Sequence, residues 1–139
     1  MKVNSAGCFP IIKAISDACF FGIERPPDEI LRYAFESGTI FTQSFGTVIV
    51  GFAILTHEAG QPFLWTIAVL PEARGRGVAS DLLREVIAEC TNSLGRHLTL
   101  TCTVDNPAQK LYFDHGFRVV KILPHYYGEK NGLRMRRVL

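Results

Sequence analysis

The chain has 139 residues, 47% of them hydrophobic and 20% charged, and its formal net charge is +2. This length favours one domain spanning residues 1–139, and the composition is that of a globular protein that can bury a core without disulfides or metals. So small a net charge gives no global reason to bind nucleic acid or a membrane surface, so any basic feature that matters must be local.

Two helices are expected in the first third of the chain. Phe9–Phe20 is expected to form the first helix, because Pro10 falls in its first turn, where proline is tolerated. Two prolines then interrupt the chain. Pro27–Ser37 is expected to form the second helix, since acidic residues at its start and Gly38 after its end favour these boundaries.

A meander of three strands is expected next. Thr39–Phe45 and Val48–Thr56 flank a short turn at Gly46, and Phe63–Val69 follows a second turn. The odd-numbered side chains of the third strand are expected to share one face, because successive side chains of a strand alternate. These residues are Phe63, Trp65, Ile67 and Val69.

Gly77–Leu94 is the clearest helix, because apolar residues recur along it at helical spacing. These residues are Val78, Leu82, Val86, Ile87, Cys90 and Leu94. His97–Val104 alternates apolar residues with threonines and is expected to be a strand. A short helix is expected from Asn106 to Gly116. Two last strands are expected at Arg118–Leu123 and Arg134–Leu139, with a polar, aromatic loop at His125–Gly132 between them. This order predicts a mixed α/β layer around one sheet.

The four cysteines indicate buried thiols rather than disulfides or metal ligands. Cys8, Cys19, Cys90 and Cys102 have no metal-ligand spacing, and a chain of this length does not need disulfides. No secretory signal is evident, and no apolar run approaches the roughly 20 residues of a membrane helix. We therefore expect a cytoplasmic protein with no metal site.

A glycine-arginine turn precedes the long helix, in the sequence LPEARGRGVASDLL at 70–83. The first backbone N–H groups of a helix lack partners within the helix and lie at the positive end of its dipole. Gly75 and Gly77 permit positive φ and close approach of a ligand, while Arg74 and Arg76 add positive charge. A strand, a glycine-rich turn and a helix in this order suit a pyrophosphate.

Other interpretations of this turn are less well supported. The G-x-x-x-x-G-K-[ST] phosphate loop is absent, and the dinucleotide fingerprint is matched only in half. RNA binding through RGRG would require more such clusters. A surface turn that only starts a helix remains open on spacing alone.

Two segments resemble motifs of the GNAT acetyltransferase superfamily. RGRGVA at 74–79 resembles its R/Q-x-x-G-x-G/A motif, and NPAQKLY at 106–112, with GF at 116–117, resembles its N…A…LY…GF segment. The resemblance covers about Thr39–Leu139. It implies an α/β (α+β) fold with a single mixed, mostly antiparallel sheet flanked by helices, in which the first strand is short or missing.

The resemblance implies acetyl-CoA as the cofactor. Its pyrophosphate would lie on the turn before the long helix, held by backbone N–H groups and neighbouring charge. The residues implied are Arg74, Gly75, Arg76, Gly77, Val78 and Ala79. The pantetheine arm would lie along Ile67, Ala68 and Val69, and Asn106, or Asp105 beside it, would hydrogen-bond the arm.

Acetyl transfer to an amine also needs an oxyanion donor and proton carriers. The resemblance implies a backbone N–H near Val69 close to the thioester carbonyl, where it would stabilise developing negative charge. It implies that Tyr112, the Tyr of the LY pair, donates a proton to the departing thiolate. The alternative for Tyr112 is a packing role beside Leu111 and Phe117.

No general base is evident on the central strand, which has threonines at 99, 101 and 103. His125 has a suitable unshifted pKa and is a candidate catalytic base, with an ordinary loop histidine as the alternative. Glu58 falls in an expected hairpin turn, where a solvated charge is the ordinary interpretation. A chain of waters that needs no strong base is equally compatible with the sequence.

The tail HYYGEKNGLRMRRVL at 125–139 resembles family members that acetylate protein N-termini, including those of ribosomal proteins. Tyr126, Tyr127 and Met135 match, and the two tyrosines would line a peptide slot; packing within the loop is the alternative. Where that subgroup carries its acidic base, this chain has Thr101. A polyamine acceptor would need more acidic residues than the N-terminal group at Glu24, Asp28, Glu29 and Glu36.

The sequence thus predicts an acetyl-CoA-dependent N-acetyltransferase that acts on a primary amine, either a protein or peptide N-terminus or a small molecule. The alternatives are a non-catalytic CoA-binding module that senses or regulates, and a small structural domain. No nucleic-acid or membrane partner is expected, and a homodimer is left open.

Overall fold

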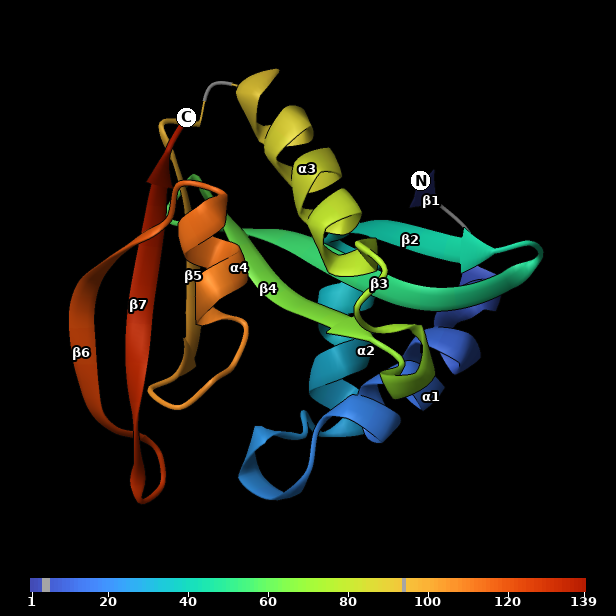
Figure 1. Cartoon of the computed structure of the whole chain (residues 1–139), viewed down its shortest axis with the longest axis horizontal. Coiled ribbons are helices and arrows are strands. Elements are labelled where there is room, and N and C mark those ends of the chain that lie inside the picture. Colours follow the sequence, from blue (N-terminus) through green and yellow to red (C-terminus); the bar gives the residue numbers. More distant parts are fainter. Residues whose placement is uncertain (4–5, 94) are drawn as a thin grey trace.

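The computed structural model describes residues 1–3, 6–93 and 95–139 (Figure 1). Within these residues the helices are α1 Phe9–Cys19, α2 Asp28–Ser37, α3 Val78–Thr91 and α4 Gln109–Asp114. The strands are β1 Lys2–Val3, β2 Thr39–Phe45, β3 Val48–Glu58, β4 Gln61–Val69, β5 His97–Thr103, β6 Arg118–Tyr127 and β7 Lys130–Val138. Short 3-10 turns occur at η1 Ala6–Cys8, η2 Gly22–Glu24 and η3 Pro71–Ala73.

The seven described strands form one sheet in the order β1-β2-β3-β4-β5-β7-β6. All neighbours are antiparallel except β4 and β5, which are parallel. The predicted mixed, mostly antiparallel sheet is therefore confirmed. The short first strand is confirmed as well, since β1 has two residues and pairs with β2 at Phe41 and Ile40.

Helices cover both faces of the sheet, and β3 shows how the sequence divides between them. Ala53 and Leu55 belong to an apolar cluster with α3 and α4, whereas Phe52 and Ile54 belong to a second cluster with α1 and α2. This alternation follows from the two-residue period of a strand. Figure 1 shows α3 and α4 on one side of the sheet and α1 and α2 on the other.

The helix boundaries agree with expectation to within three residues, and the largest differences are at the start of α4 and the end of α3. Gly38 ends α2 for reasons of space, because a Cβ there would lie 2.7 Å from the Ala34 carbonyl oxygen and 2.8 Å from that of Leu55. In the apolar stripe of α3, Val78, Leu82, Val86 and Cys90 are buried and Ile87 is partly buried. The predicted member Leu94 lies outside the described residues. No described helix is long and apolar enough to span a membrane.

A bulge in β4 overturns the prediction that its odd-numbered side chains share one face. Ile54 of β3 pairs with Thr66, but the next residue of β3 pairs with Leu64, so Trp65 is an extra residue. Trp65 packs against the α1–α2 cluster, whereas Ile67 lies in the α3–α4 cluster. The bulge inverts the alternation, which single-sequence periodicity does not reveal.

The predicted loop at His125–Gly132 is wrong. β6 continues to Tyr127, β7 begins at Lys130, and Gly128, with φ of 70°, lies in the turn between them. β6 is an edge strand exposed along most of its length, so it lacks the apolar alternation from which a strand is recognised.

Candidate active site

The two glycines before α3 adopt the conformation that the sequence predicts. Gly75 has φ of 79° and Gly77 has φ of 81°, in the left-handed region that favours glycine. The first hydrogen bond within the helix runs from the Asp81 N–H to the Gly77 carbonyl, at 2.9 Å. The N–H groups of the first turn, from Val78 to Ser80, precede that bond and have no partner within the helix.

The two arginines of this turn point in different directions. Arg74 donates from Nε to the Val69 carbonyl oxygen at 3.0 Å and lines the adjacent groove. The guanidinium carbon of Arg76 lies 5.4 Å from the centre of the Phe45 ring, and Arg76 is not part of the groove lining. The Cys19 thiol also donates to the Val69 carbonyl oxygen, at 3.3 Å, so this oxygen accepts two hydrogen bonds.

A groove of about 730 Å³ runs from this turn along β4. Its wall includes Ile67, Ala68, Val69, Arg74, Gly75, Gly77, Val78, Ala79 and Asn106, which are all of the sequence-predicted cofactor residues except Arg76. Three separate segments of the chain therefore meet at one surface.

Beyond Leu64, the edge of β4 that faces the groove has no neighbouring strand among the described residues. Leu70 donates its N–H to the Val50 carbonyl at 2.9 Å, and in an antiparallel ladder the pairs on either side point away from the partner. The N–H groups of Ile67 and Val69 therefore point away from β3. Within the described residues, β4 and β5 pair only at Phe63 and Leu64 and then diverge (Figure 1).

A second cavity, of about 290 Å³, lies beside the groove. Its lining includes the predicted acceptor residues Tyr126 and Tyr127, whose ring centres are 5.0 Å apart. It also includes the carboxylates of Glu24 and Glu58, and no other charged side chain of the described residues. Thr101 lines it too, and its buried Oγ1 has no hydrogen-bond partner among the described residues.

The groove and the cavity share part of their lining. The shared residues are Phe20, Glu24, Ile67, Thr103, Asn106 and Tyr112. A ligand in the groove and a ligand in the cavity would therefore approach one another at these side chains, and Tyr112 and Glu24 are the shared residues whose side chains titrate.

Tyr112 is 5% exposed and packs edge-on against Phe117, with ring centres 5.9 Å apart. Burial raises the pKa of its hydroxyl well above the usual value, so the phenol stays protonated at neutral pH. Burial likewise raises the pKa of Tyr127. Both groups are therefore hydrogen-bond donors in the resting protein.

Asn106 and Asp105 both line the groove but have different partners. Asn106 Oδ1 accepts a hydrogen bond of 2.8 Å from the Ala108 N–H, which starts the turn into α4. Asp105 lies 3.2 Å from the Lys130 ammonium, and hydrogen bonds from Thr103 and then Lys130 lower the pKa of its carboxyl.

The structure does not bring His125 to this site. His125 has φ of 52°, its side chain is exposed, and its Nδ1 lies 3.3 Å from the Gly128 carbonyl oxygen at the hairpin end. It lines neither the groove nor the cavity. Glu58, the weaker candidate from sequence, does line the cavity.

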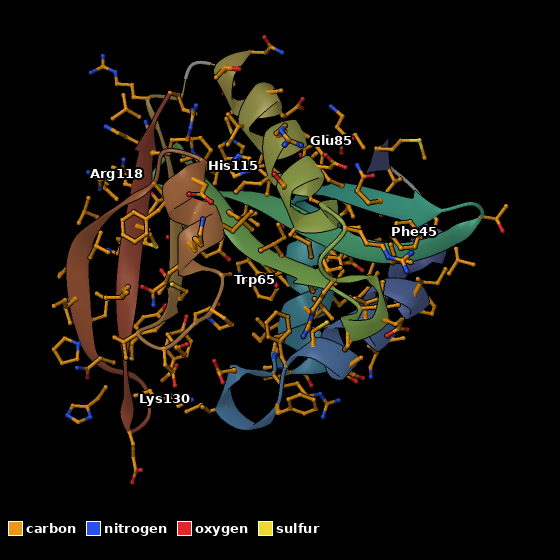
Figure 2. All side chains as sticks on the ribbon, in the orientation of Figure 1. Phe45, Trp65, Glu85, His115, Arg118 and Lys130 are labelled. Carbon is orange, nitrogen blue, oxygen red and sulfur yellow. The ribbon has the colours of Figure 1, made fainter. Side chains whose placement is uncertain are left out.

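Sequence reasoning missed two features of the site. Glu24 lies in η2, a segment between helices whose side-chain directions depend on how α1 and α2 pack. Ser80 of α3 lines the groove, and its Oγ lies 2.8 Å from Nε2 of His115. Figure 2 labels His115 at the end of α4. The linear sequence carries no signal for the position of Glu24 or for the contact between Ser80 and His115.

Comparisons with known proteins agree with this architecture. The profile of the Acetyltransferase (GNAT) family matches residues 9–117. An uncharacterised N-acetyltransferase of Methanocaldococcus jannaschii is 30% identical over 86 residues, and the match spans 57% of this chain but only 52% of that relative.

Solved structures resemble the whole fold. The ribosomal-protein-S18-alanine N-acetyltransferase from Escherichia coli superposes with a TM-score of 0.87 at 20% identity, over 99% of this chain and 94% of that one. A GNAT family acetyltransferase from Elizabethkingia anophelis, with acetyl-CoA bound, gives a TM-score of 0.85 at 19% identity, over 100% and 97%. At such identities the likeness concerns the fold. With the sequence match over most of its length, this chain belongs to the GNAT acetyltransferase family.

Proposed function

We propose that the protein is an acetyl-CoA-dependent N-acetyltransferase whose acceptor is the N-terminal amine of a polypeptide. The observation that carries this proposal is the junction of the groove and the cavity at Tyr112 and Glu24. Two cavities that meet at titratable groups suit a reaction between two bound molecules, because holding both in one cleft removes much of the entropy cost of their encounter.

The groove has the chemistry that coenzyme A requires. The N–H groups that open α3, together with Arg74, would bind its pyrophosphate. The unpaired edge of β4 would hydrogen-bond the amide groups of the pantetheine arm, as a further strand would, and Asn106 would contact the arm from the opposite wall. The neighbour from Elizabethkingia anophelis, which was crystallised with acetyl-CoA, supports this choice of ligand.

Acetyl-CoA would supply an activated thioester carbonyl. The acceptor nitrogen forms a bond to the carbonyl carbon, the carbon–sulfur bond breaks, and the sulfur leaves as a thiolate that takes a proton. The Val69 N–H, which points away from β3, would stabilise the negative charge that develops on the carbonyl oxygen. Tyr112, held protonated by burial, would donate to the departing sulfur.

Glu24 is our candidate for the proton acceptor, in place of His125. It lies on both cavities, so its carboxylate can attract an ammonium group and receive a proton from the nitrogen, directly or through water. An N-terminal amine, with an ordinary pKa near 8, gives up its proton more readily than a lysine, whose pKa is near 10. A weak base therefore suffices for an N-terminus.

The aromatic wall of the cavity supports a polypeptide acceptor. Tyr126 and Tyr127 come from the end of the β6–β7 hairpin, and their rings offer apolar faces with hydroxyl donors at the tip. A chain that enters past them would present its terminal amine to Glu24. A small-molecule amine is the competing acceptor.

The test is a reaction with acetyl-CoA and a panel of peptides and small amines, read by thiol release and by mass spectrometry of the products. We expect a mass gain of one acetyl group on the N-terminal nitrogen of peptides. Glu24→Gln should lower the rate about a hundredfold, within the range for loss of a general base, and leave acetyl-CoA binding intact. Acetyl-CoA binding without any product would instead make the protein a non-catalytic sensor.

A further inference from the structure

In the β5–β7 half of the sheet, one face carries cationic side chains that have no ion-pair partner among the described residues. On β7, Met135 is buried in the α3–α4 cluster, and Arg137 donates from Nε to the His115 carbonyl oxygen at 2.7 Å on that same side. Arg134 and Arg136 occupy the intervening positions and therefore project from the opposite face of the sheet.

Strand pairing brings a third cation to that face. Arg134 lies opposite Thr101 of β5 on one side and opposite Lys121 of β6 on the other. Arg136 lies opposite Thr99. Lys121, Arg134 and Arg136 thus form one basic platform beside the threonines of β5.

Arg118 is not part of this platform, although it pairs with Arg136. Its guanidinium donates to the Phe117 carbonyl at 2.7 Å and lies 5.6 Å from the centre of the Phe113 ring.

Nothing in the described part of the chain neutralises the basic platform. The ion pairs of those residues include Lys110 with Asp114 and Lys130 with Asp105, but none that involves the platform. Among the described residues, the apolar cluster of α1 and α2 includes none from β5, β6 or β7. Lys121 and Arg136 are exposed and Arg134 is half-buried, so the platform is open to a ligand.

The platform adjoins the acceptor cavity. Thr101 lines that cavity with a buried hydroxyl that has no partner among the described residues, and Arg134 is its direct cross-strand neighbour. The charged side chains of the cavity itself are carboxylates, Glu24 and Glu58. A molecule that occupies both places would carry a positive end in the cavity and negative charge just outside it.

We propose that the acceptor is a polypeptide with acidic side chains shortly after its N-terminal amine, and that the basic platform binds them. This rests on the proposed function. Lys121 lies two strands from Thr101, roughly 10 Å, a distance that about three extended residues span. The acidic residues should therefore fall at about the third to fifth positions. A nucleic acid matches the charge of the platform but offers no aliphatic amine to the cavity.

The test compares two heptapeptides that differ only at the third to fifth positions, where one has glutamates and the other glutamines. For the natural sequence we expect kcat/KM to be about tenfold higher with the acidic peptide, mainly through KM, and this preference should shrink as salt is raised. Arg134→Gln with Arg136→Gln should abolish the preference and leave acetyl-CoA binding unchanged. Lys110→Gln, which removes a cation from α4, should keep it.

Direct binding of the same peptides, labelled with a fluorophore, distinguishes the two proposals. If the acidic peptide binds more tightly and the arginine variants lose this difference, but no peptide is acetylated, the platform stands and the acetyltransferase proposal fails. If both peptides are acetylated or bound equally by the natural sequence, the platform proposal is overturned. It is also overturned if a twelve-residue oligothymidylate displaces the acidic peptide at lower concentration than an unlabelled copy of that peptide does.

Discussion

At the scale of single residues, the site depends on groups whose ionisation and backbone shape are set by their surroundings. Tyr112 is buried, which raises the pKa of its hydroxyl and keeps the proton in place. Gly77 holds a backbone conformation that other residues adopt at a cost. For Tyr112 and for Gly77, a substitution can separate the residue's role in the site from its role in stability.

Tyr112→Phe should lower kcat about a hundredfold, within the range for loss of a general acid, and leave the acetyl-CoA dissociation constant nearly unchanged. Because burial raises the pKa of Tyr112, its proton is present throughout the neutral range, so the deficit should be the same from pH 6 to pH 9. Steady-state rates across this range provide the measurement. Tyr33→Phe, at an exposed position on α2, is the control. An unchanged kcat would remove Tyr112 from the reaction.

Gly77→Leu and Gly46→Leu form a matched pair. Both glycines have positive φ, 81° and 60°, and a Cβ at either meets no atom within 4 Å, so each substitution should cost about 1–3 kcal/mol of stability through backbone strain. Gly77 opens α3 on the groove, whereas Gly46 lies in the β2–β3 turn, away from it. Titration calorimetry should show at least about tenfold weaker acetyl-CoA binding, equivalent to 1.4 kcal/mol, for Gly77→Leu alone. Equal affinities would mean that this turn is not the phosphate site.

At the scale of elements, His115 ties α4 to its neighbours. Its Nε2 lies 2.8 Å from Ser80 Oγ of α3, and its carbonyl accepts from Arg137 of β7. Burial, and then the nearby charge of Arg84, lower the pKa of His115 below its ordinary value. The unfolded chain therefore binds a proton at a higher pH than the folded chain does.

Stability from His115 is thus present above the ordinary histidine pKa of about 6.5 and is lost as the pH falls through the folded value. The free energy of unfolding should drop between pH 7.5 and pH 5.5 in the natural sequence and drop less in His115→Gln. Denaturant unfolding at the two pH values measures this difference. His57→Gln, at an exposed position in β3, should behave like the natural sequence. An identical pH dependence for His115→Gln would show that the histidine is not the titrating group.

At the scale of the whole molecule, the divergence of β4 and β5 creates the site. The two strands pair at Phe63 and Leu64, and beyond this point residues of both strands line the acceptor cavity and the groove, whose linings meet there. A ligand that fills the gap would join the β1–β4 half of the sheet to the β5–β7 half. Its binding should therefore stabilise the entire fold rather than one segment.

Acetyl-CoA at one hundred times its dissociation constant should raise the free energy of unfolding by about 2.7 kcal/mol, if it binds only the folded chain. Thermal unfolding with and without the ligand, followed by circular dichroism and by tryptophan fluorescence, provides the measurement. Trp65, labelled in Figure 2, lies in the β4 bulge and lines the acceptor cavity, so its fluorescence reports on the site. If the whole fold unfolds cooperatively, both signals should shift by the same temperature. A shift of the fluorescence signal alone would indicate local ordering.

The sequence by itself determined most of the elements, the family and the glycine-arginine turn, because these depend on residues close together in the chain. The exception is the exposed end of the β6–β7 hairpin, where the sequence pattern predicts a loop. Helical periodicity predicted α3, and positive φ at Gly75 and Gly77 follows from the absence of a Cβ. Tertiary structure alone decided which side chains line the cavity and which face of the sheet each side chain occupies. It removed His125 from the cavity, brought Glu24 into it, and inverted the side-chain alternation of β4 at Trp65. Such outcomes depend on how helices pack and where a bulge falls, and these are set by contacts between residues far apart in the chain.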